Sequence, residues 1–430
     1  MSTGESKSLL RQLDWFDGCI FVYFLTLSLE LLNVQIYLYK LKVGHVLATI
    51  LFCIFFSLQK KISVERSVRA PAVAIFLSLL ISALFSAHPF RCAGYLGVYV
   101  FNFLVYFVLP YQLMILRGIK VLKVYFASFV VVGLYACAQV FFSLFDVYDP
   151  SAPQRVAFIA RGQALTYEPS YYALYMTLFV MFYNTRFLLS SARKISLRTL
   201  LGVNLLLLVS TSTGIFFSYP AFVLTLFCFS LFSFMPSRIS KKRLIGFLGV
   251  IASVIGIVFF FFPDIIAYSL LKFFYWGFGH NSFTTRWEGM YNSVSTFLNN
   301  PWIGVGLGGV GPSLYQHYYE AGNQVETLME AELFDPTNTF TEILGSLGLV
   351  GFCAFGFLAW RFIQSYKKAI SSNTASKDAK ILAASFFISV VVGMIVLQFN
   401  SGLFRPYIWV HIALALAYFR SLEMRAEDAC

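Results

Sequence analysis

Long apolar segments recur along the whole chain, and they constrain its fold more than any other feature of the sequence. Of the 430 residues, 59% are hydrophobic and 12% are charged, against about 45 to 50% and about 25% in an average soluble domain. A chain of this composition is predicted to fold within a lipid bilayer, where a spanning helix needs about 20 predominantly apolar residues.

Twelve segments are predicted to be transmembrane helices, of which the seventh is short. They are residues 17–34, 43–59, 71–87, 93–116, 124–145, 170–188, 197–210, 213–235, 244–262, 338–360, 381–397 and 403–419. The sequence therefore predicts an all-α, polytopic membrane protein with a single integral membrane domain over residues 1–430.

The basic residues lie mainly between alternate pairs of these segments. With both termini on one side, most of the 32 Lys and Arg residues lie on that side, so the positive-inside rule predicts cytoplasmic termini. Topology signals of this kind explain the net charge of +12, and no nucleic-acid partner is expected. Residues 1–15 are polar and include Asp14, so the first span is expected to act as an uncleaved signal.

The cysteines and histidines show no pattern typical of a metal or cofactor site. CxxC and HExxH motifs and a GxxxxGK phosphate loop are absent from the sequence, so neither a metal nor a cofactor is expected. Only Cys92 of the seven cysteines is predicted near the external face, so no structural disulfide is expected.

Two external loops are long, and long loops are usually functional. They are residues 146–168 and residues 263–337. The larger loop is predicted to contain a helix from Ser282 to Asn299. An apolar face on this helix is expected to dock on the bundle; it comprises Trp287, Met290, Tyr291, Val294, Phe297 and Leu298. A glycine-rich stretch over 304–311 follows, where the backbone is able to approach a ligand or another helix closely, or simply turns.

Four arginines are candidate site residues on the external side, which is poor in Lys and Arg: Arg155, Arg161, Arg286 and Arg405. A guanidinium pairs well with phosphate, so two or three that converge would hold a pyrophosphate. The alternative for each is a salt bridge within a loop.

Glu168 lies where the sixth span leaves the external face, with Pro169 suited to the first turn of the helix. Its carboxylate is a candidate general base, and the alternative is that it complements the helix dipole. His317 in the large loop is another candidate base, although a solvated loop histidine is the more common case. Polar residues within the predicted spans are functional candidates or interhelical hydrogen-bonding groups; they are Glu30, Gln139, Asn204, Gln398 and Asn400.

Short motifs in these loops resemble those of the bacterial O-antigen polymerase and O-antigen ligase superfamily, Wzy-like and WaaL-like. They run from Arg286-Trp287 through Asn299-Asn300-Pro301-Trp302-Ile303-Gly304-Val305-Gly306 to Asn338 and Leu347-Gly348-Leu349-Val350-Gly351. Arg161 followed by Tyr167-Glu168-Pro169-Ser170 is similar to the polymerase branch. Where ligases carry His-Pro-His-Asn, this chain has Asp335-Pro336-Thr337-Asn338, so the base of that family is not transferable.

The resemblance implies a GT-C-like, inverting, metal-independent glycosyltransferase of the bacterial inner membrane with a periplasmic active site. It would polymerise oligosaccharide repeat units carried on undecaprenyl pyrophosphate, with membrane lipid and a protein that regulates chain length as further partners. The resemblance implies that Glu168, Arg161 and Arg286 are catalytic, with Arg155, Tyr167, Tyr171, Arg405, Asn338, Asp335 and His317 in substrate binding.

Three other functions are consistent with parts of the sequence. One is an O-antigen ligase that transfers the glycan to the lipid A core. Another is a transporter or flippase for lipid-linked oligosaccharides, for which twelve spans is a common plan, although transporters usually show repeated halves and no repeat is evident here. The third is an assembly protein that binds polysaccharide without catalysis.

Overall fold

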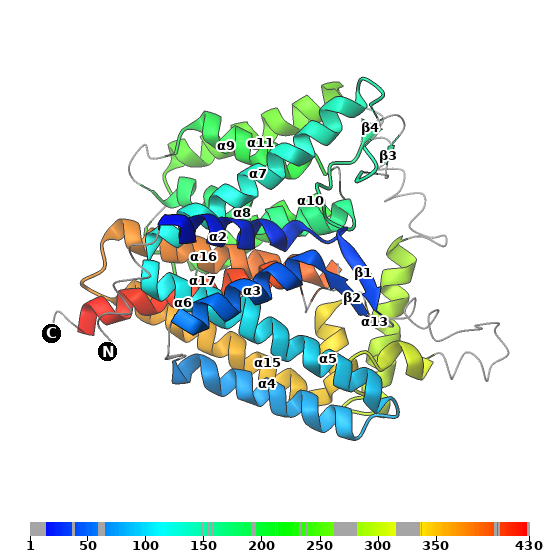
Figure 1. Cartoon of the computed structure of the whole chain (residues 1–430). Helices are drawn as coiled ribbons and strands as arrows, with labels where there is room; N and C mark the ends of the chain where they lie inside the picture. The colour runs from blue at the N-terminus through cyan, green and yellow to red at the C-terminus, as the bar shows by residue number, and fades with distance from the viewer. Residues whose placement is uncertain are drawn as a thin grey trace.

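The computed structural model is an all-α bundle of helices that run roughly side by side (Figure 1). It describes residues 14–36, 39–58, 65–147, 149–152, 155–156, 159–190, 195–210, 212, 214–231, 234–237, 239–261, 282–314, 336, 338–399, 402 and 405–427. Among these residues, four helical stretches are long and apolar enough to cross a membrane, and five shorter helices are apolar as well. The protein is therefore an all-α membrane protein.

Each of the twelve predicted segments contains a helix. The helices are α2 (Asp14–Leu25), α3 (Val43–Leu58), α4 (Arg66–Leu84), α5 (Pro89–Phe101), α6 (Leu109–Arg117), α7 (Ile119–Ser143), α8 (Pro169–Leu189), α9 (Leu197–Leu208), α10 (Gly214–Leu231), α11 (Lys241–Phe261), α15 (Thr339–Ser371), α16 (Lys377–Val396) and α17 (Pro406–Glu427). A π-helical turn over Asn102–Val108 joins α5 to α6, and the stretch Pro89–Arg117 corresponds to one predicted segment.

Helices α8 and α16 form the centre of the bundle, because most of their side chains are buried. Small residues on α16, among them Ala383, Ala384 and Gly393, let it approach α8 closely; a Cβ at Gly393 would lie 2.6 Å from Leu178. Close approach through small residues is typical of helices that associate in lipid. Buried amides join neighbouring helices too, since Asn184 on α8 and Asn204 on α9 exchange side-chain hydrogen bonds of 2.9 and 3.1 Å.

The first predicted span is wrong in its last third. Helix α2 and a short 3₁₀ turn (Thr26–Ser28) end before Glu30, and strands β1 (Asn33–Ile36) and β2 (Tyr39–Lys42) form an antiparallel hairpin. Val34 and Ile36 alternate with Asn33 and Gln35, which is a strand pattern. The predicted helical segment 17–34 wrongly included the start of this strand. Glu30 therefore lies beyond the helix, not within a span.

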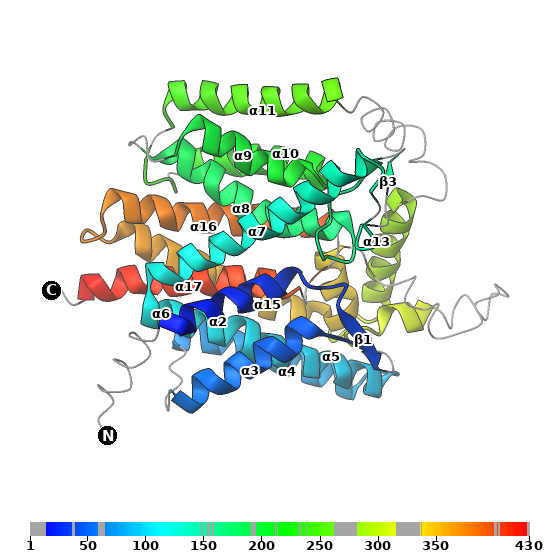
Figure 2. The same cartoon turned by 45° about the horizontal axis from the view of Figure 1, so that its top comes forward.

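Helix α13 (Ser282–Asn299) confirms the helix predicted within the larger loop. It lies across one end of the bundle, roughly perpendicular to the other helices (Figure 2). The predicted docking face is wrong, because Trp287, Tyr291 and Leu298 are 60%, 68% and 69% exposed. The helix packs on α15 through small and polar residues instead; these include Ser293, and a Cβ at Gly345 would lie 2.8 Å from its carbonyl oxygen.

The glycine-rich stretch packs against another helix. Gly304 has φ +65°, and a Cβ there would lie 2.3 Å from the carbonyl carbon of Ser346 on α15. Gly348 breaks the regular geometry of α15 with φ +61° and ψ −162°, and a Cβ there would lie 2.4 Å from the carbonyl carbon of Trp302. Backbone hydrogen bonds connect the two segments, from Leu349 N to Pro301 O (2.8 Å) and from Gly306 N to Ser346 O (2.9 Å). Two motifs of the family resemblance thus contact each other directly.

The contact between these motifs predicts a strong effect of one methyl group. Gly348→Ala forces a side chain into a glycine-only conformation, which costs about 1 to 3 kcal/mol, and adds a clash with the Trp302 backbone. We expect the thermal unfolding temperature of the purified protein to fall by several degrees. Gly356→Ala is the matched control on the same helix: nothing lies within 4 Å of its added Cβ, so it should leave the temperature unchanged or raise it. Equal behaviour of the two variants would contradict this packing.

Candidate functional site

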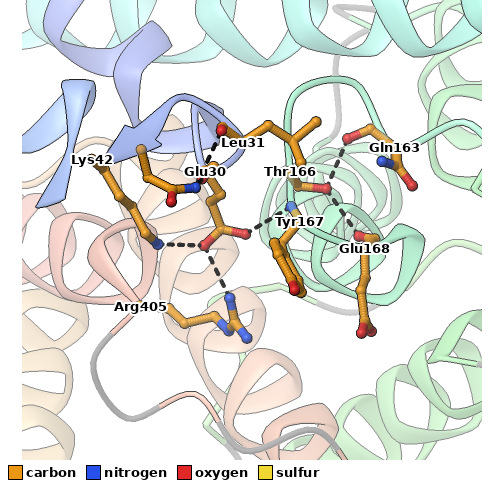
Figure 3. Close-up of polar contacts among 9 residues, drawn as sticks. Glu30, Leu31, Lys42, Gln163, Thr166, Tyr167, Glu168 and Arg405 are labelled. Carbon is orange, nitrogen blue, oxygen red and sulfur yellow. Dashed lines mark hydrogen bonds and ion pairs between the residues drawn. The ribbon is translucent and has the colours of Figure 1, made fainter. Parts of the chain in front are cut away.

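A buried cluster of charges lies at the end of the bundle that α13 crosses, and Glu30 is at its centre (Figure 3). Its Oε1 atom accepts hydrogen bonds from Lys42 Nζ and from Arg405 Nη1, both at 3.0 Å. Its Oε2 atom accepts one from the backbone N–H of Tyr167 at 3.3 Å. The side chain of Glu30 is 4% exposed and that of Arg405 is 13% exposed, so the charges compensate one another in a largely dry environment.

The electrostatics of the cluster follow from these contacts. Burial raises the pKa of Glu30, but the Arg405 and Lys42 cations outweigh it and hold the pKa of this carboxyl below its ordinary value of 4.5. Burial lowers the pKa of Arg405, and the Glu30 carboxylate raises it above its usual range. Both groups therefore remain charged at neutral pH.

Arg405 also stacks on Tyr171, with its guanidinium carbon 3.3 Å from the ring centroid. Arg405 directly precedes α17, and Tyr171 lies in the first turn of α8. Of the two roles that the sequence left open for Arg405, substrate binding and a salt bridge, the structure shows the salt bridge. Its contact with the tyrosine ring brings two of the predicted site residues together.

The chain before Glu168 is held on two sides. On one side, the backbone N–H groups of Glu30 and Leu31 donate to Leu165 O at 2.9 and 3.0 Å. On the other, Gln139 on α7 accepts from Ala164 N at 2.8 Å and donates to Ala164 O at 2.9 Å. Gln139 thus bonds this loop to α7 and does not join two helices.

Glu168 itself is half-buried and directly precedes α8. Its carboxylate makes no capping hydrogen bond to the helix backbone; Oε2 accepts from the Ser170 hydroxyl at 3.0 Å. Glu168 and Glu30 lie on opposite sides of Tyr167, and the Glu168 side chain points away from the Glu30 cluster (Figure 3). The protein therefore holds one acid inside an ion cluster and a second acid beside it.

Arg286 on α13 belongs to the same neighbourhood. Burial lowers the pKa of its guanidinium, while the Glu168 carboxylate and the Tyr171 hydroxyl act in the opposite direction. Arg286 thus interacts electrostatically with Glu168 and Tyr171, two neighbouring residues that are distant from it in the sequence. A fixed cation and a half-buried carboxylate on one site are suited to holding a developing negative charge and accepting a proton.

The other predicted site residues have varied positions. Asn338 caps α15: its Oδ1 accepts from Thr341 N at 3.0 Å, and its Nδ2 donates to Gln398 O at 2.9 Å, so its side chain has a structural role. Arg161 is half-buried, Tyr167 is 49% exposed, and Arg155 lies in the two-residue strand β3 (Arg155–Val156), which pairs with β4 (Ile159–Ala160). Asp335 and His317, as well as Asn400, lie outside the described residues.

Lys42 is the site residue that the sequence analysis missed. It ends strand β2 and contacts Glu30 from across the hairpin turn. Lys40 and Lys42 both lie between the predicted segments 17–34 and 43–59, on the side that is poor in basic residues. They were a signal of the same kind as the four arginines.

No group of three or more His, Cys, Asp or Glu side chains suited to a metal ion occurs among the residues that the structure describes. The expectation of a metal-independent enzyme stays a prediction.

Residues 197–356 match the family model for O-antigen ligase. This match covers 160 of the 430 residues. It agrees with the superfamily that the sequence motifs resemble, whose members are glycosyltransferase-like membrane enzymes. No curated protein matches the chain. The matched region runs from α9 into α15, so it contains Arg286 and the close contacts of Gly304 with Ser346 and of Gly348 with Trp302. Glu30, Glu168 and Arg405 lie outside it.

The Glu30 cluster predicts a specific dependence of stability on pH. Because folding lowers the pKa of Glu30, its contribution is complete above pH 4.5, the ordinary value, and is lost as the pH falls through the lower pKa of the folded state. Glu30→Gln leaves Arg405 buried without its carboxylate partner, which typically costs about 3 to 5 kcal/mol.

Thermal unfolding of the purified protein between pH 3 and 7 checks this expectation. The variant should unfold at a lower temperature at pH 7 and approach the wild type as the pH falls. Glu65→Gln is the control, since Glu65 is 34% exposed and lies 3.8 Å from Arg420; an exposed pair of this kind contributes about 0 to 1 kcal/mol. A constant difference between Glu30→Gln and wild type across this range would contradict the assignment.

Proposed function

We propose that the protein is a glycosyltransferase that polymerises oligosaccharide repeat units carried on undecaprenyl pyrophosphate. The observation that carries the proposal is the shared neighbourhood of Glu168, Tyr171 and Arg286, which come from two separate segments of the chain. The family match over residues 197–356 supports it, because polymerases and ligases of O-antigen both transfer glycans from a lipid carrier.

The proposed topology has the helices of all twelve predicted segments crossing the inner membrane of a bacterium, with the first segment shortened to end before Glu30 and both termini cytoplasmic. Helix α13 and the Glu168 neighbourhood then face the periplasm. Support comes from the positive-inside distribution of Lys and Arg and from the exposed Trp287 and Tyr291 on α13, residue types that prefer the headgroup level of a bilayer. The architecture would be GT-C-like.

The proposed reaction is a single displacement at the anomeric carbon of the donor glycan. A hydroxyl oxygen of the acceptor repeat unit forms the new bond to that carbon, and the bond from the carbon to the pyrophosphate oxygen breaks. Undecaprenyl pyrophosphate leaves with the electron pair, and the hydroxyl proton passes to the base. The configuration at the carbon inverts.

Glu168 is the proposed base and Arg286, together with Arg161, the proposed clamp for the pyrophosphate. A general base typically contributes about 10²- to 10⁴-fold in rate, and a fixed donor aimed at developing charge about 10²- to 10³-fold. Arg155 and the Tyr167 and Tyr171 rings are proposed to contact the glycan. Asp335 and His317 are kept as proposed substrate contacts in the larger loop. Arg405 is proposed to position Tyr171, with which it stacks.

An apolar groove lies near the charge cluster and suits the polyprenyl tail of the donor. Its volume is about 410 Å³, and it is lined by His45, Val46, Ile50 and Phe101, among others, from α3 and α5. His45 follows Lys42 by three residues, so a lipid lying in the groove would bring its pyrophosphate toward the Glu30 cluster. Its lining is almost entirely apolar, as a hydrocarbon chain requires.

A ligase is the second candidate, favoured by the family that residues 197–356 match. The polymerase is preferred because the Tyr167-Glu168-Pro169-Ser170 segment forms part of the site, whereas Asp335-Pro336-Thr337-Asn338 replaces the histidine-containing motif of ligases. A chain-length regulator is proposed as a partner of the polymerase.

Glycan chain length in cells that lack the native protein provides the test. Wild type should restore a ladder of many repeats. Arg286→Ala and Glu168→Gln should reduce polymer to single repeats, corresponding to a loss of about 10²-fold or more in rate. Arg198→Ala and Glu288→Gln are matched controls, because both residues are exposed and neither belongs to the proposed site. Membrane levels of every variant are measured alongside.

The pattern of products distinguishes the alternatives. If wild type is required for glycan to reach its final acceptor and polymer accumulates on the lipid carrier without it, the protein is a ligase. Retention of lipid-linked units on the cytoplasmic face would identify a transporter. Full ladders with Arg286→Ala and Glu168→Gln would remove these residues from the site and favour an assembly protein.

Metal independence is tested directly with purified protein and a lipid-linked donor. Turnover should continue at an unchanged rate after chelation with EDTA, because Arg286 and Arg161 are proposed to hold the pyrophosphate charge. A loss of turnover that Mg²⁺ or Mn²⁺ restores would show that the clamp needs a metal.

A further inference from the structure

A second cavity lies at the opposite end of the bundle from the Glu30 cluster, among the ends of α6, α7, α8, α16 and α17, and its volume is about 1000 Å³. Two helices show how far it is from the candidate site. Helix α8 begins beside Glu168 and reaches the cavity at Arg186, and α17 begins beside Arg405 and reaches it at Met424. Figure 1 shows this end, where α2 begins and α17 ends. The cavity is therefore separate from the proposed catalytic site.

The rim of the cavity is basic. Four cationic side chains line it, Arg117, Lys120, Lys123 and Arg186, against one acidic side chain, Asp378. Lys120 and Lys123 are exposed. Arg117 forms an ion pair with Asp17 on α2, so part of its charge is already balanced, and the lysines carry most of the remaining excess.

The N-terminus of α7 adds to this positive potential. Helix α7 begins at Ile119, and residues of its first turn line the cavity. Helix α16 begins at Lys377, but Ser376 caps it and Asp378 lies in its first turn. The residue before α7 is Gly118, which has no side chain to cap the helix. The partial positive charge of a helix N-terminus favours anions, in the same sense as the four basic side chains.

The floor of the cavity is apolar and aromatic. Phe126 and Tyr183 lie against each other there with ring centroids 5.6 Å apart, and Leu382 lines the floor with them. The apolar surface continues outward along α7, where Val130 is 38% exposed and lines the cavity, and Leu134, one turn further, is 58% exposed. The cavity thus joins an anion-binding rim to a lipid-facing apolar stripe.

We propose that this cavity binds an anionic phospholipid, with its phosphate headgroup at Lys120 and Lys123 and an acyl chain along Phe126, Val130 and Leu134. Anionic lipids of the cytoplasmic leaflet are attracted to basic pockets between transmembrane helices. A free phosphate would use the rim and leave the apolar floor in contact with water. A zwitterionic phospholipid would fill the floor but lacks the net charge that the rim complements.

Native mass spectrometry of the full-length protein in detergent tests the proposal. The protein is titrated with phosphatidylglycerol, with phosphatidylcholine of the same acyl chains and with inorganic phosphate. Phosphatidylglycerol should bind in a saturable way and more tightly than phosphatidylcholine, and inorganic phosphate should not displace it. The double variant Lys120→Gln/Lys123→Gln should lower the affinity for phosphatidylglycerol about 25-fold, since each lysine near a headgroup contributes about fivefold to the affinity.

Matched variants separate this site from the general charge of the surface. Lys241→Gln/Lys242→Gln removes the same charge from exposed lysines on α11 outside the cavity; they lie at the same end of the bundle, because the adjacent Arg243 donates to Phe187 O on α8 at 3.2 Å. The Lys241→Gln/Lys242→Gln variant should retain wild-type affinity for phosphatidylglycerol. Val130→Asn should lower this affinity. Equal binding of the two lipids, equal losses in both lysine pairs, or full displacement by inorganic phosphate would each overturn the proposal.

Discussion

The ion pair between Glu30 and Arg405 joins the beginning and the end of the chain, and the candidate site is built around it. A buried pair is tolerated only when its charges and hydrogen-bonding atoms are compensated, and Glu30 meets this condition with two cations and one backbone N–H group. Each partner comes from a different segment: the β1–β2 hairpin, the loop before α8 and the start of α17. Their convergence positions Tyr171, which lies under the Arg405 guanidinium.

The position of Arg286 depends on close packing of backbone segments and not on ion pairs within the Glu30 cluster. Helix α13 carries Arg286, and it is held across the end of the bundle by its contact with α15. The chain that follows α13 continues this contact through Gly304, whose φ of +65° and missing Cβ let it lie against Ser346. The glycine-rich stretch over 304–311 therefore packs against α15, and this packing fixes the position of the helix that carries Arg286.

Most helices of the bundle were predictable, because twenty-residue apolar runs leave little choice of structure in a bilayer. Helix α13 was predictable too, from its 3.6-residue period, but the face that packs was not. The apolar residues Trp287, Tyr291 and Leu298 are largely exposed, whereas Ser293 is buried. Small side chains permit closer approach of two helices, and this outweighed the area of the apolar face. The β-hairpin was missed because its apolar residues extended the preceding apolar run.

Local sequence alone determined the helical, membrane-embedded class of the protein, its resemblance to the O-antigen polymerase and ligase superfamily, and the candidacy of Glu168, Arg286 and Tyr171. These properties follow from composition, periodicity and short motifs, each of which lies within a few neighbouring residues. Only the tertiary structure decided that Arg405 pairs with Glu30, that Asn338 caps α15, and that Lys42 belongs to the site. Such roles depend on which distant segments meet, and an ion pair across 375 positions of the chain leaves no trace in either local sequence.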